Sequence, residues 1–308
     1  SCVYCYQNKN EKLMTTEVAN MIIEKIDRIL NDNIFEGINI HYFGGEPLLN
    51  IPVLVYLDEN IKKITDKIGI VYKAFLTTNG SMLSKELLQK VKFSSIQLTF
   101  DGLEKTHDRL RVSDHFHFKE EIELIENIMN FSQAKVLLRT NICKENKDEI
   151  IALHKYIFEK FGNERIEINP NRTIKYHQDD SFEMLSVQEY AEVAYQIKLL
   201  WSEQKGKFEL PVPRSTPCKF PYGNAYAISP EGYCTFCSGS MDQEKKYFFD
   251  VDIENKKMFS VRKECKKCNI LPLCLGGCII QYNLRAGACT YEKYELKNIL
   301  ISYIKHIS

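Results

Sequence analysis

The sequence predicts an α/β fold, a partial (β/α)6 barrel that is TIM-like but open, followed by a cysteine-rich domain and a C-terminal helix. Three observations lead to this prediction. Strand-like and helix-like segments alternate over residues 16–169, which is typical of a parallel sheet with right-handed crossovers. Turns rich in glycine, asparagine or aspartate follow the strands. Eight of the eleven cysteines lie between Cys218 and Cys289, where the composition changes.

The elements follow from hydrophobic periodicity. The first helix has one apolar face, Val18, Ile22, Ile26 and Ile29, and the second has Asn50 as its candidate N-cap. The expected helices cover residues 16–31, 51–68, 85–91, 118–131 and 149–161, and the strands cover 37–43, 70–77, 95–100, 135–142 and 165–169. One more strand is expected before Ser1, because the chain lacks an initiator Met and reads as a fragment. Six strands are fewer than the eight that close a full barrel.

The rest of the chain divides into a linker and a second domain. Residues 171–182 are polar and irregular, and Ser186-x-x-Glu189 is a capping box that begins a helix through Trp201. The apolar stripe of that helix is Tyr190, Val193, Ile197 and Leu200. We therefore expect a barrel over 1–182, a linker helix region over 183–210, and a cysteine-rich domain with a C-terminal helix over 211–308.

Composition narrows the classes of function. Lys plus Arg and Asp plus Glu both number 41, and this zero net charge argues against a nucleic-acid or anionic-membrane partner. No apolar run approaches the length of a membrane span and no secretory signal is visible, so a cytoplasmic location is expected. Disulfide scaffolds are usually small secreted chains, which makes metal binding in a reducing compartment the favoured use of the cysteines.

Chemistry-bearing motifs stand at the predicted strand ends. The first strand runs directly into Gly44, Gly45, Glu46 and Pro47, where two glycines allow a ligand to approach the backbone. An ordinary turn is the alternative explanation of this motif alone. Later strands end in Thr77-Thr78-Asn79-Gly80, Thr99-Phe100-Asp101-Gly102 and Arg139-Thr140-Asn141. Ligands of parallel α/β sheets bind at this carboxyl edge.

Cys2 and Cys5 open the chain as a C-x2-C pair. Alone, such a pair also fits a zinc knuckle or a redox site. Together with the strand-end motifs it resembles the radical S-adenosylmethionine (radical SAM) enzymes, whose signature is C-x3-C-x2-C. Cys2 and Cys5 would be the second and third cysteines, and the first would lie three residues before Ser1, outside this sequence.

The resemblance implies a 4Fe–4S cluster with three thiolate-bound irons and one open iron, which takes the amino and carboxylate groups of S-adenosylmethionine. An electron then splits the sulfonium and gives a 5′-deoxyadenosyl radical. By the same resemblance the Gly44–Pro47 turn receives the amino group. Arg139, in the Arg139-x-Asn141 motif, would bind the carboxylate through two parallel hydrogen bonds. Thr99, where the family usually has Ser, keeps a hydroxyl for the cofactor, and the backbone of Tyr4 would lie near the adenine. His107, Asp108 and Arg111 are expected to brace the loop.

The last third resembles the SPASM extension of radical SAM enzymes that modify peptides and proteins. The matching spacing is Cys265-x2-Cys268-x5-Cys274-x3-Cys278, with Cys218 and Cys237 before it and Cys289 after it. That extension carries two auxiliary 4Fe–4S clusters, which makes three clusters in all. The resemblance implies that Cys265, Cys268, Cys274 and Cys289 hold the distal cluster and that Cys218, Cys237 and Cys278 hold the proximal one.

The fourth ligand of the proximal cluster stays open. Sulfatase-maturing relatives supply a cysteine shortly before the equivalent of Cys218, and this chain has none there, so the iron is open or Cys234 reaches it. Cys143 fits no cluster and is expected to be a small buried apolar residue. The rival for the whole region is a pair of structural zinc sites in a non-catalytic binding module. Zinc–thiolate sites are colourless and iron–sulfur clusters are brown.

These motifs predict a radical SAM enzyme that modifies a ribosomally made peptide, forming a thioether or carbon–carbon crosslink. The alternative is an anaerobic sulfatase-maturing enzyme that makes formylglycine. The absence of a cysteine shortly before Cys218 argues against this alternative. A peptide or protein substrate and an electron donor such as flavodoxin or ferredoxin are the expected partners. No residue is identified as a general base.

Overall fold

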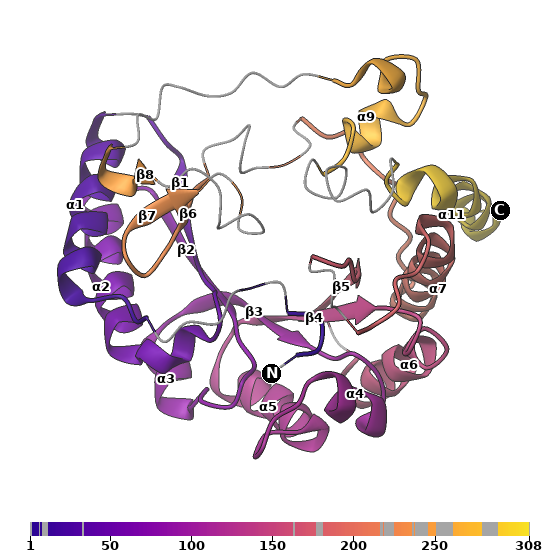
Figure 1. Cartoon of the computed structure of the whole chain (residues 1–308), viewed down its shortest axis with the longest axis horizontal. Helices are drawn as coiled ribbons and strands as arrows, with labels where there is room; N and C mark the ends of the chain where they lie inside the picture. The colour runs from indigo at the N-terminus through magenta and orange to yellow at the C-terminus, as the bar shows by residue number, and fades with distance from the viewer. Residues whose placement is uncertain are drawn as a thin grey trace.

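A five-stranded parallel sheet is the centre of the structure, which is a computed structural model. It describes residues 2–5, 7, 12–32, 34–162, 164–176, 181–215, 218, 225–235, 237, 246–250, 261–278 and 289–307. The sheet order β1-β2-β3-β4-β5 equals the chain order, so each crossover returns the chain to the neighbouring strand. In Figure 1 the sheet curves and the helices lie along its outer side. The predicted α/β fold is confirmed.

The described elements match the predicted alternation to within a few residues at most ends. The strands are β1 (Gly37–Tyr42), β2 (Val71–Thr77), β3 (Phe93–Thr99), β4 (Lys135–Ile142) and β5 (Ile166–Arg172). The helices of this half are α1 (Thr16–Asp32), α2 (Ile51–Ile68), α3 (Lys85–Lys90), α4 (Glu104–Leu110), α5 (Phe118–Phe131) and α6 (Ile150–Phe161). Helix α4 was not predicted.

The two faces of the sheet differ in chemistry. Side chains alternate between faces along each strand, and those toward the helices are apolar and buried. This outer set is at most 1% exposed: Ala74, Leu76, Ile96, Leu98, Val136 and Leu138. The inner positions between them carry mainly polar and aromatic groups: His41, Phe75, Thr77, Gln97, Thr99, Arg139, Asn141, Asn169 and Asn171. A core that covers only one face leaves the other for ligands.

Two predicted details need correction. Asn50 is the N-cap residue of α2, as predicted, but its side chain makes no capping bond; its Nδ2 donates to the Met14 carbonyl instead, at 2.8 Å. The 3-10 turn η1 (Pro47–Asn50) precedes α2 directly, and Glu46 caps that turn by accepting from the Leu48 amide. The predicted linker also begins too early, because β5 continues through Pro170 to Arg172. Proline is tolerated there because β5 is an edge strand of this sheet.

Helix α7 (Val187–Lys205) joins the main core. The predicted capping box is present, with the Ser186 side chain on the Glu189 amide and the Glu189 side chain on the Ser186 amide. Trp201 is 4% exposed and donates from Nε1 to Nδ1 of the fully buried His154 at 3.1 Å. Helix α7 therefore seals the side of the sheet at α6 and β5.

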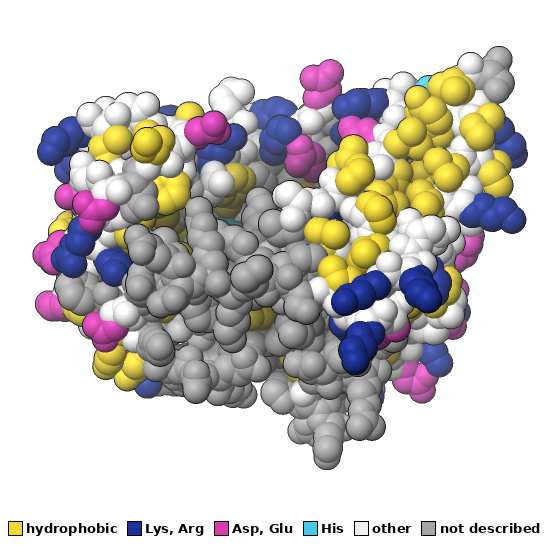
Figure 2. Space-filling view, turned by 90° about the horizontal axis from the view of Figure 1, so that it is seen from above, with side chains coloured by type: hydrophobic (Ala, Val, Ile, Leu, Met, Phe, Trp, Pro, Cys, Tyr) yellow, Lys and Arg dark blue, Asp and Glu magenta, His cyan; other side chains and the backbone are white. Residues whose placement is uncertain are grey.

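The C-terminal third contains short elements. Strands β6 (Ala227–Ile228), β7 (Tyr233–Thr235) and β8 (Lys246–Tyr247) form an antiparallel sheet beside α1, and α9 (Leu271–Cys274) is a single turn. Helix α11 (Glu292–Ile307) packs on α7 and is held by the Lys198–Glu295 and Arg214–Glu292 ion pairs, both 2.6 Å. Its other face is apolar and 42–63% exposed, at Leu300, Ile301, Ile304 and Ile307; Figure 2 shows hydrophobic side chains gathered on this side. Among the described helices, none has the length and apolarity to cross a bilayer.

Candidate cofactor site

The turn after β1 leaves open space at its glycines. Gly44 has φ +153°, inside the region that favours glycine. A Cβ built on Gly44 or on Gly45 would meet no described atom within 4 Å. The backbone is therefore accessible to a ligand at the edge where the sequence predicts one.

Glu46 ties the ends of β1 and β2 together. Its Oε1 accepts from the Leu48 amide at 3.0 Å and from the Thr78 hydroxyl at 2.7 Å, and its Oε2 accepts from the Asn79 amide at 2.7 Å. The sequence predicted Glu46 as part of a cofactor-binding turn. The structure gives the side chain a further role, in which one carboxylate fixes the Gly44–Pro47 turn to the Thr77–Gly80 turn.

Thr99, Arg139 and Asn141 lie together at the next two strand ends. Thr99 pairs in register with Arg139 across β3 and β4, and the Arg139 Nε donates to Asn141 Oδ1 at 2.8 Å. Thr99 is 6% exposed and Asn141 is 8% exposed. The bond to Asn141 fixes the plane of the half-buried guanidinium, which is the geometry needed for a carboxylate.

The Cys2–Cys5 loop docks against the end of α4. Cys2 forms an antiparallel bridge with Arg111, and the Val3 amide donates to the Leu110 carbonyl at 3.1 Å. The Cys5 amide donates to the Cys2 carbonyl at 3.3 Å, which turns the loop, and both thiols are free and partly exposed. Burial raises the pKa of the Cys2 thiol, and the Arg111 charge opposes that rise.

A buried polar network holds Tyr4 beside the strand ends. The Tyr4 hydroxyl donates to Asp101 Oδ2 and accepts from Asn141 Nδ2 at 3.2 Å. The other Asp101 oxygen accepts from the Asn141 amide at 2.7 Å, and Asn146 Nδ2 donates to the Asp101 carbonyl at 2.7 Å. Burial is the main reason why the pKa values of both Tyr4 and Asp101 are raised.

Asp101 stands in the Thr99–Gly102 motif, from which no partner for it could be predicted, and neither Asn146 nor Glu121 was predicted as a site residue. The aspartate-glycine pair after a strand was the available signal for Asp101. Its link to Tyr4 spans 97 positions, and no local pattern reports such a contact. Asp108 does brace the loop as expected, since its Oδ1 accepts from the Phe118 amide at 2.9 Å.

Comparison with known proteins decides the family. The model of the radical SAM superfamily matches residues 1–157, which is half of the chain. The chain belongs to the radical SAM superfamily. As a radical SAM protein it is an enzyme, and the resemblance stated from its motifs is confirmed.

Two curated proteins are similar in sequence. An uncharacterized protein of Methanocaldococcus jannaschii is 33% identical over 108 residues, which cover 34% of this chain and 35% of that protein. The radical SAM cyclopropyl synthase TigE of Paramaledivibacter caminithermalis is 23% identical over an alignment 346 positions long. The alignment covers 97% of this chain and 71% of that enzyme. This chain thus spans about a third of the first relative and most of the second.

Solved structures share the fold. The structure of anSMEcpe with bound AdoMet has a TM-score of 0.72 and 18% identity, and the match covers 100% of this chain and 96% of that one. Streptococcus suis SuiB bound to S-adenosylmethionine has a TM-score of 0.58 and 16% identity, with 91% and 68% covered.

The residues present fit the radical SAM cofactors. Two free thiols stand on one short loop, and the glycine turn beside the strand ends has room for a ligand.

A surface hollow of about 700 Å³ lies elsewhere, at the C-terminal ends of α5 and α6 and near the amino edge of the sheet, where no predicted site residue is found.

In the last third, free thiols are found at Cys234, Cys265, Cys268, Cys274, Cys278 and Cys289. Leu275, Gly276 and Gly277 follow one another with φ of +46°, +90° and +73°, between Cys274 and Cys278. Successive backbone amides in such turns often form concavities that bind anionic groups, including iron–sulfur clusters. Within the described ranges no three His, Cys, Asp or Glu side chains come together as ligands of one metal ion. The grouping of the auxiliary ligands remains a prediction.

Cys143 and Cys234 are both buried. Cys143 is fully buried, as predicted, and burial raises the pKa of its thiol to about 12. Cys234 is 3% exposed, lies on β7 within the main core, and has its thiol pKa raised to about 12 by burial. Burial in apolar surroundings disfavours the thiolate, which is the form of cysteine that binds a cluster.

Proposed function

We propose that the protein is a radical SAM maturase that modifies a ribosomally made peptide, forming a thioether or a carbon–carbon crosslink. The observation that carries the proposal is the polar inner face of the sheet, which lies next to the predicted cofactor residues. It rests also on the likeness, over 99% of this chain, to anSMEcpe solved with AdoMet and a peptide.

The inner face offers paired donors and acceptors. Asn169 Nδ2 donates to Gln97 Oε1 at 3.1 Å, and Asn171 Nδ2 donates to Asn169 Oδ1 at 2.9 Å. On the first strands His41 Nε2 and Thr77 Oγ1 are 2.8 Å apart. Amide and hydroxyl groups match the main chain of a peptide, which presents both donors and acceptors. An apolar small molecule would make no use of the donor and acceptor capacity that these side chains keep beyond those bonds.

The cofactor residues are proposed as the sequence predicted them. Cys2 and Cys5 would hold the cluster. Tyr4, Gly44, Gly45, Glu46, Pro47, Thr99, Arg139 and Asn141 would surround S-adenosylmethionine. When bound, the two groups supply one-electron cleavage of the sulfonium and a radical that abstracts hydrogen. The side chains of this protein would position the two groups. Glu46 fixes the glycine turn, Asn141 orients Arg139, and Tyr4 ties the cysteine loop to Asp101.

Two auxiliary 4Fe–4S clusters are also proposed, with Cys265, Cys268, Cys274 and Cys289 on the distal one and Cys218, Cys237 and Cys278 on the proximal one. The core position of Cys234 favours an open proximal iron over a fourth thiolate from this residue. An open iron suits a substrate sulfur, because thiolate is the preferred ligand of such clusters. A flavodoxin or ferredoxin is proposed as the electron donor.

Formylglycine formation on a sulfatase is the second candidate. The TM-score of 0.72 to anSMEcpe, an anaerobic sulfatase maturase, favours it. The match to a cyclopropyl synthase along 97% of this chain favours formation of a new carbon–carbon bond.

The test begins with cofactors. Anaerobic reconstitution should give about twelve irons per intact chain from three clusters, and Cys2→Ala/Cys5→Ala should abolish formation of 5′-deoxyadenosine from S-adenosylmethionine while keeping the auxiliary iron. Cys143→Ala is the matched control and should keep both. Iron near four per chain together with bound zinc would reject the SPASM assignment.

The second stage identifies the reaction. The protein is incubated with the peptide or sulfatase encoded beside its gene, and the product is analysed by mass spectrometry and hydrazide trapping. A crosslink appears as loss of two hydrogen atoms without a trappable aldehyde. A trapped aldehyde establishes formylglycine instead and overturns the crosslinking proposal.

A further inference from the structure

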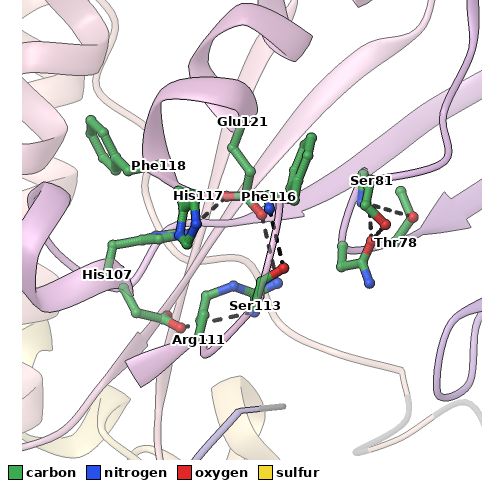
Figure 3. A network of polar contacts seen from close by, with 12 residues as sticks. Thr78, Ser81, His107, Arg111, Ser113, Phe116, His117, Phe118 and Glu121 are labelled. Carbon is green, nitrogen blue, oxygen red and sulfur yellow. Dashed lines mark hydrogen bonds and ion pairs between the residues drawn. The ribbon is translucent and has the colours of Figure 1, made fainter. Parts of the chain in front are cut away.

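Arg111 stands between the cysteine loop and two buried carboxyl groups. Its side chain is 12% exposed, and its Nη1 donates to the Tyr4 hydroxyl at 3.4 Å. Nη1 is 4.0 Å from Asp101 Oδ2, and Nη2 is 3.7 Å from Glu121 Oε1. Arg111, Glu121 and His107 face one another in Figure 3. The residue thus contacts α5, the end of β3 and the loop.

The backbone of Arg111 is part of the same attachment. Its isolated β-bridge with Cys2 and the bond from the Val3 amide to the Leu110 carbonyl attach the loop to residues 110–111. The guanidinium and the loop are therefore positioned by one segment, residues 110–111. A displacement of this segment would move the charge and the cysteine together.

The positive charge of Arg111 is only partly balanced. Burial raises the pKa of Glu121 to about 8, so this carboxyl is mostly protonated near pH 7. Burial also lowers the pKa of His107 to about 3, so that imidazole is neutral. In the described part of the chain His107 Nδ1 and Glu121 Oε2 have no hydrogen-bond partner. Asp101 is the remaining anionic neighbour, and it is shared with Tyr4 and the Asn141 amide.

We propose that Arg111 is a positioning residue for the N-terminal cluster, which fixes the Cys2–Cys5 loop and makes the cluster easier to reduce. This inference rests on the assignment of Cys2 and Cys5 proposed above. The potential of an iron–sulfur cluster depends on the charges and hydrogen bonds around its sulfurs. A buried cation beside a ligand stabilises the reduced, more negative form. The step concerned is a one-electron reduction in which dithionite supplies the electron and no bond is made or broken.

The experiment is a redox titration of the reconstituted holoenzyme, followed by EPR. The N-terminal cluster is recognised as the signal that changes on addition of S-adenosylmethionine. Arg111→Gln removes the charge and keeps hydrogen-bond donors, and Arg111→Lys keeps the charge. Arg109→Gln is the matched control, because Arg109 is exposed on the same helix. We expect a more negative midpoint potential in Arg111→Gln, a smaller shift in Arg111→Lys and none in Arg109→Gln.

Asp101→Asn provides a second, opposite perturbation. It removes the negative neighbour and retains an Oδ1 that can accept from the Asn141 amide. Its midpoint potential should become more positive, so the inference remains testable if Arg111→Gln loses iron. An unchanged potential in Arg111→Gln with full iron, or shifts of the same sign in the Arg111→Gln and Asp101→Asn variants, overturns the inference alone. A wild-type protein without a signal that responds to S-adenosylmethionine overturns the cluster assignment itself.

Discussion

Replacing Glu46 by alanine removes the carboxylate that joins the ends of β1 and β2. Three hydrogen bonds are lost, to Leu48, Thr78 and Asn79. Bonds to a charged group contribute about 1.5–3 kcal/mol each, which gives about 4.5 kcal/mol at the lower limit. Glu46 is half-buried, so water replaces part of this, and the expected loss of unfolding free energy is about 2–3 kcal/mol.

The assay is urea unfolding, monitored by the fluorescence of Trp201, the single tryptophan of the chain. With an m-value near 3 kcal/mol/M, the midpoint should fall by roughly 0.7–1 M. Glu46→Gln keeps one acceptor oxygen but turns an amide N–H₂ toward backbone N–H donors, so it should cost about 1 kcal/mol. Both variants should bind S-adenosylmethionine more weakly in equilibrium dialysis. Glu24→Ala, exposed on α1, is the control. A Glu46→Ala midpoint equal to that of Glu24→Ala, with unchanged binding, would refute the reasoning.

Three other substitutions test separate parts of the structure. The pKa of Glu121 is raised from 4.5 to about 8, so its contribution to stability is complete below pH 4.5 and lost as the pH rises through 8. Glu121→Gln should therefore match the wild type near pH 5 and exceed its unfolding free energy above pH 8; equal pH profiles contradict this. Trp201→Phe leaves His154 Nδ1 without its donor and should cost about 1–3 kcal/mol in thermal or chemical unfolding. Cys234→Ala should retain full iron at a cost of about 1–2 kcal/mol, whereas loss of the proximal cluster's signal would make Cys234 a ligand.

Local signals were sufficient for most of the fold. The alternation of apolar runs predicted the five strands, because each strand buries one face against helices regardless of its partners. The Ser186–Glu189 capping box also depends on contacts within four residues, and it is present. Asn50 shows the limit of such signals. Its residue type fits an N-cap, but its side-chain amide donates a hydrogen bond to the carbonyl of Met14, 36 positions away.

The sequence predicted the separate strand-end motifs of the candidate site, but it did not predict the hydrogen bonds that join them. Each strand-end turn carries its own signature, so Gly44, Thr99 and Arg139 could be placed at one edge from topology alone. The side chains that join these turns could not be found in this way. Glu46 reaches Thr78 across 32 positions and Tyr4 reaches Asp101 across 97, and those pairings depend on strand register and loop docking. The short helix α4 was missed because seven residues give too short a periodic pattern.

The attachment of α7 has a consequence for how the nascent chain folds. The Tyr190 hydroxyl donates to the Pro170 carbonyl, and Lys205 Nζ donates to the Ile166 carbonyl, both at 2.7 Å. These bonds join the edge strand β5 to a helix that the ribosome makes later. Until residue 205 has emerged, β5 and the buried face of α6 stay exposed to water, and an exposed strand edge invites pairing with other chains. Translation must therefore pass well beyond β5 before the parallel sheet is protected.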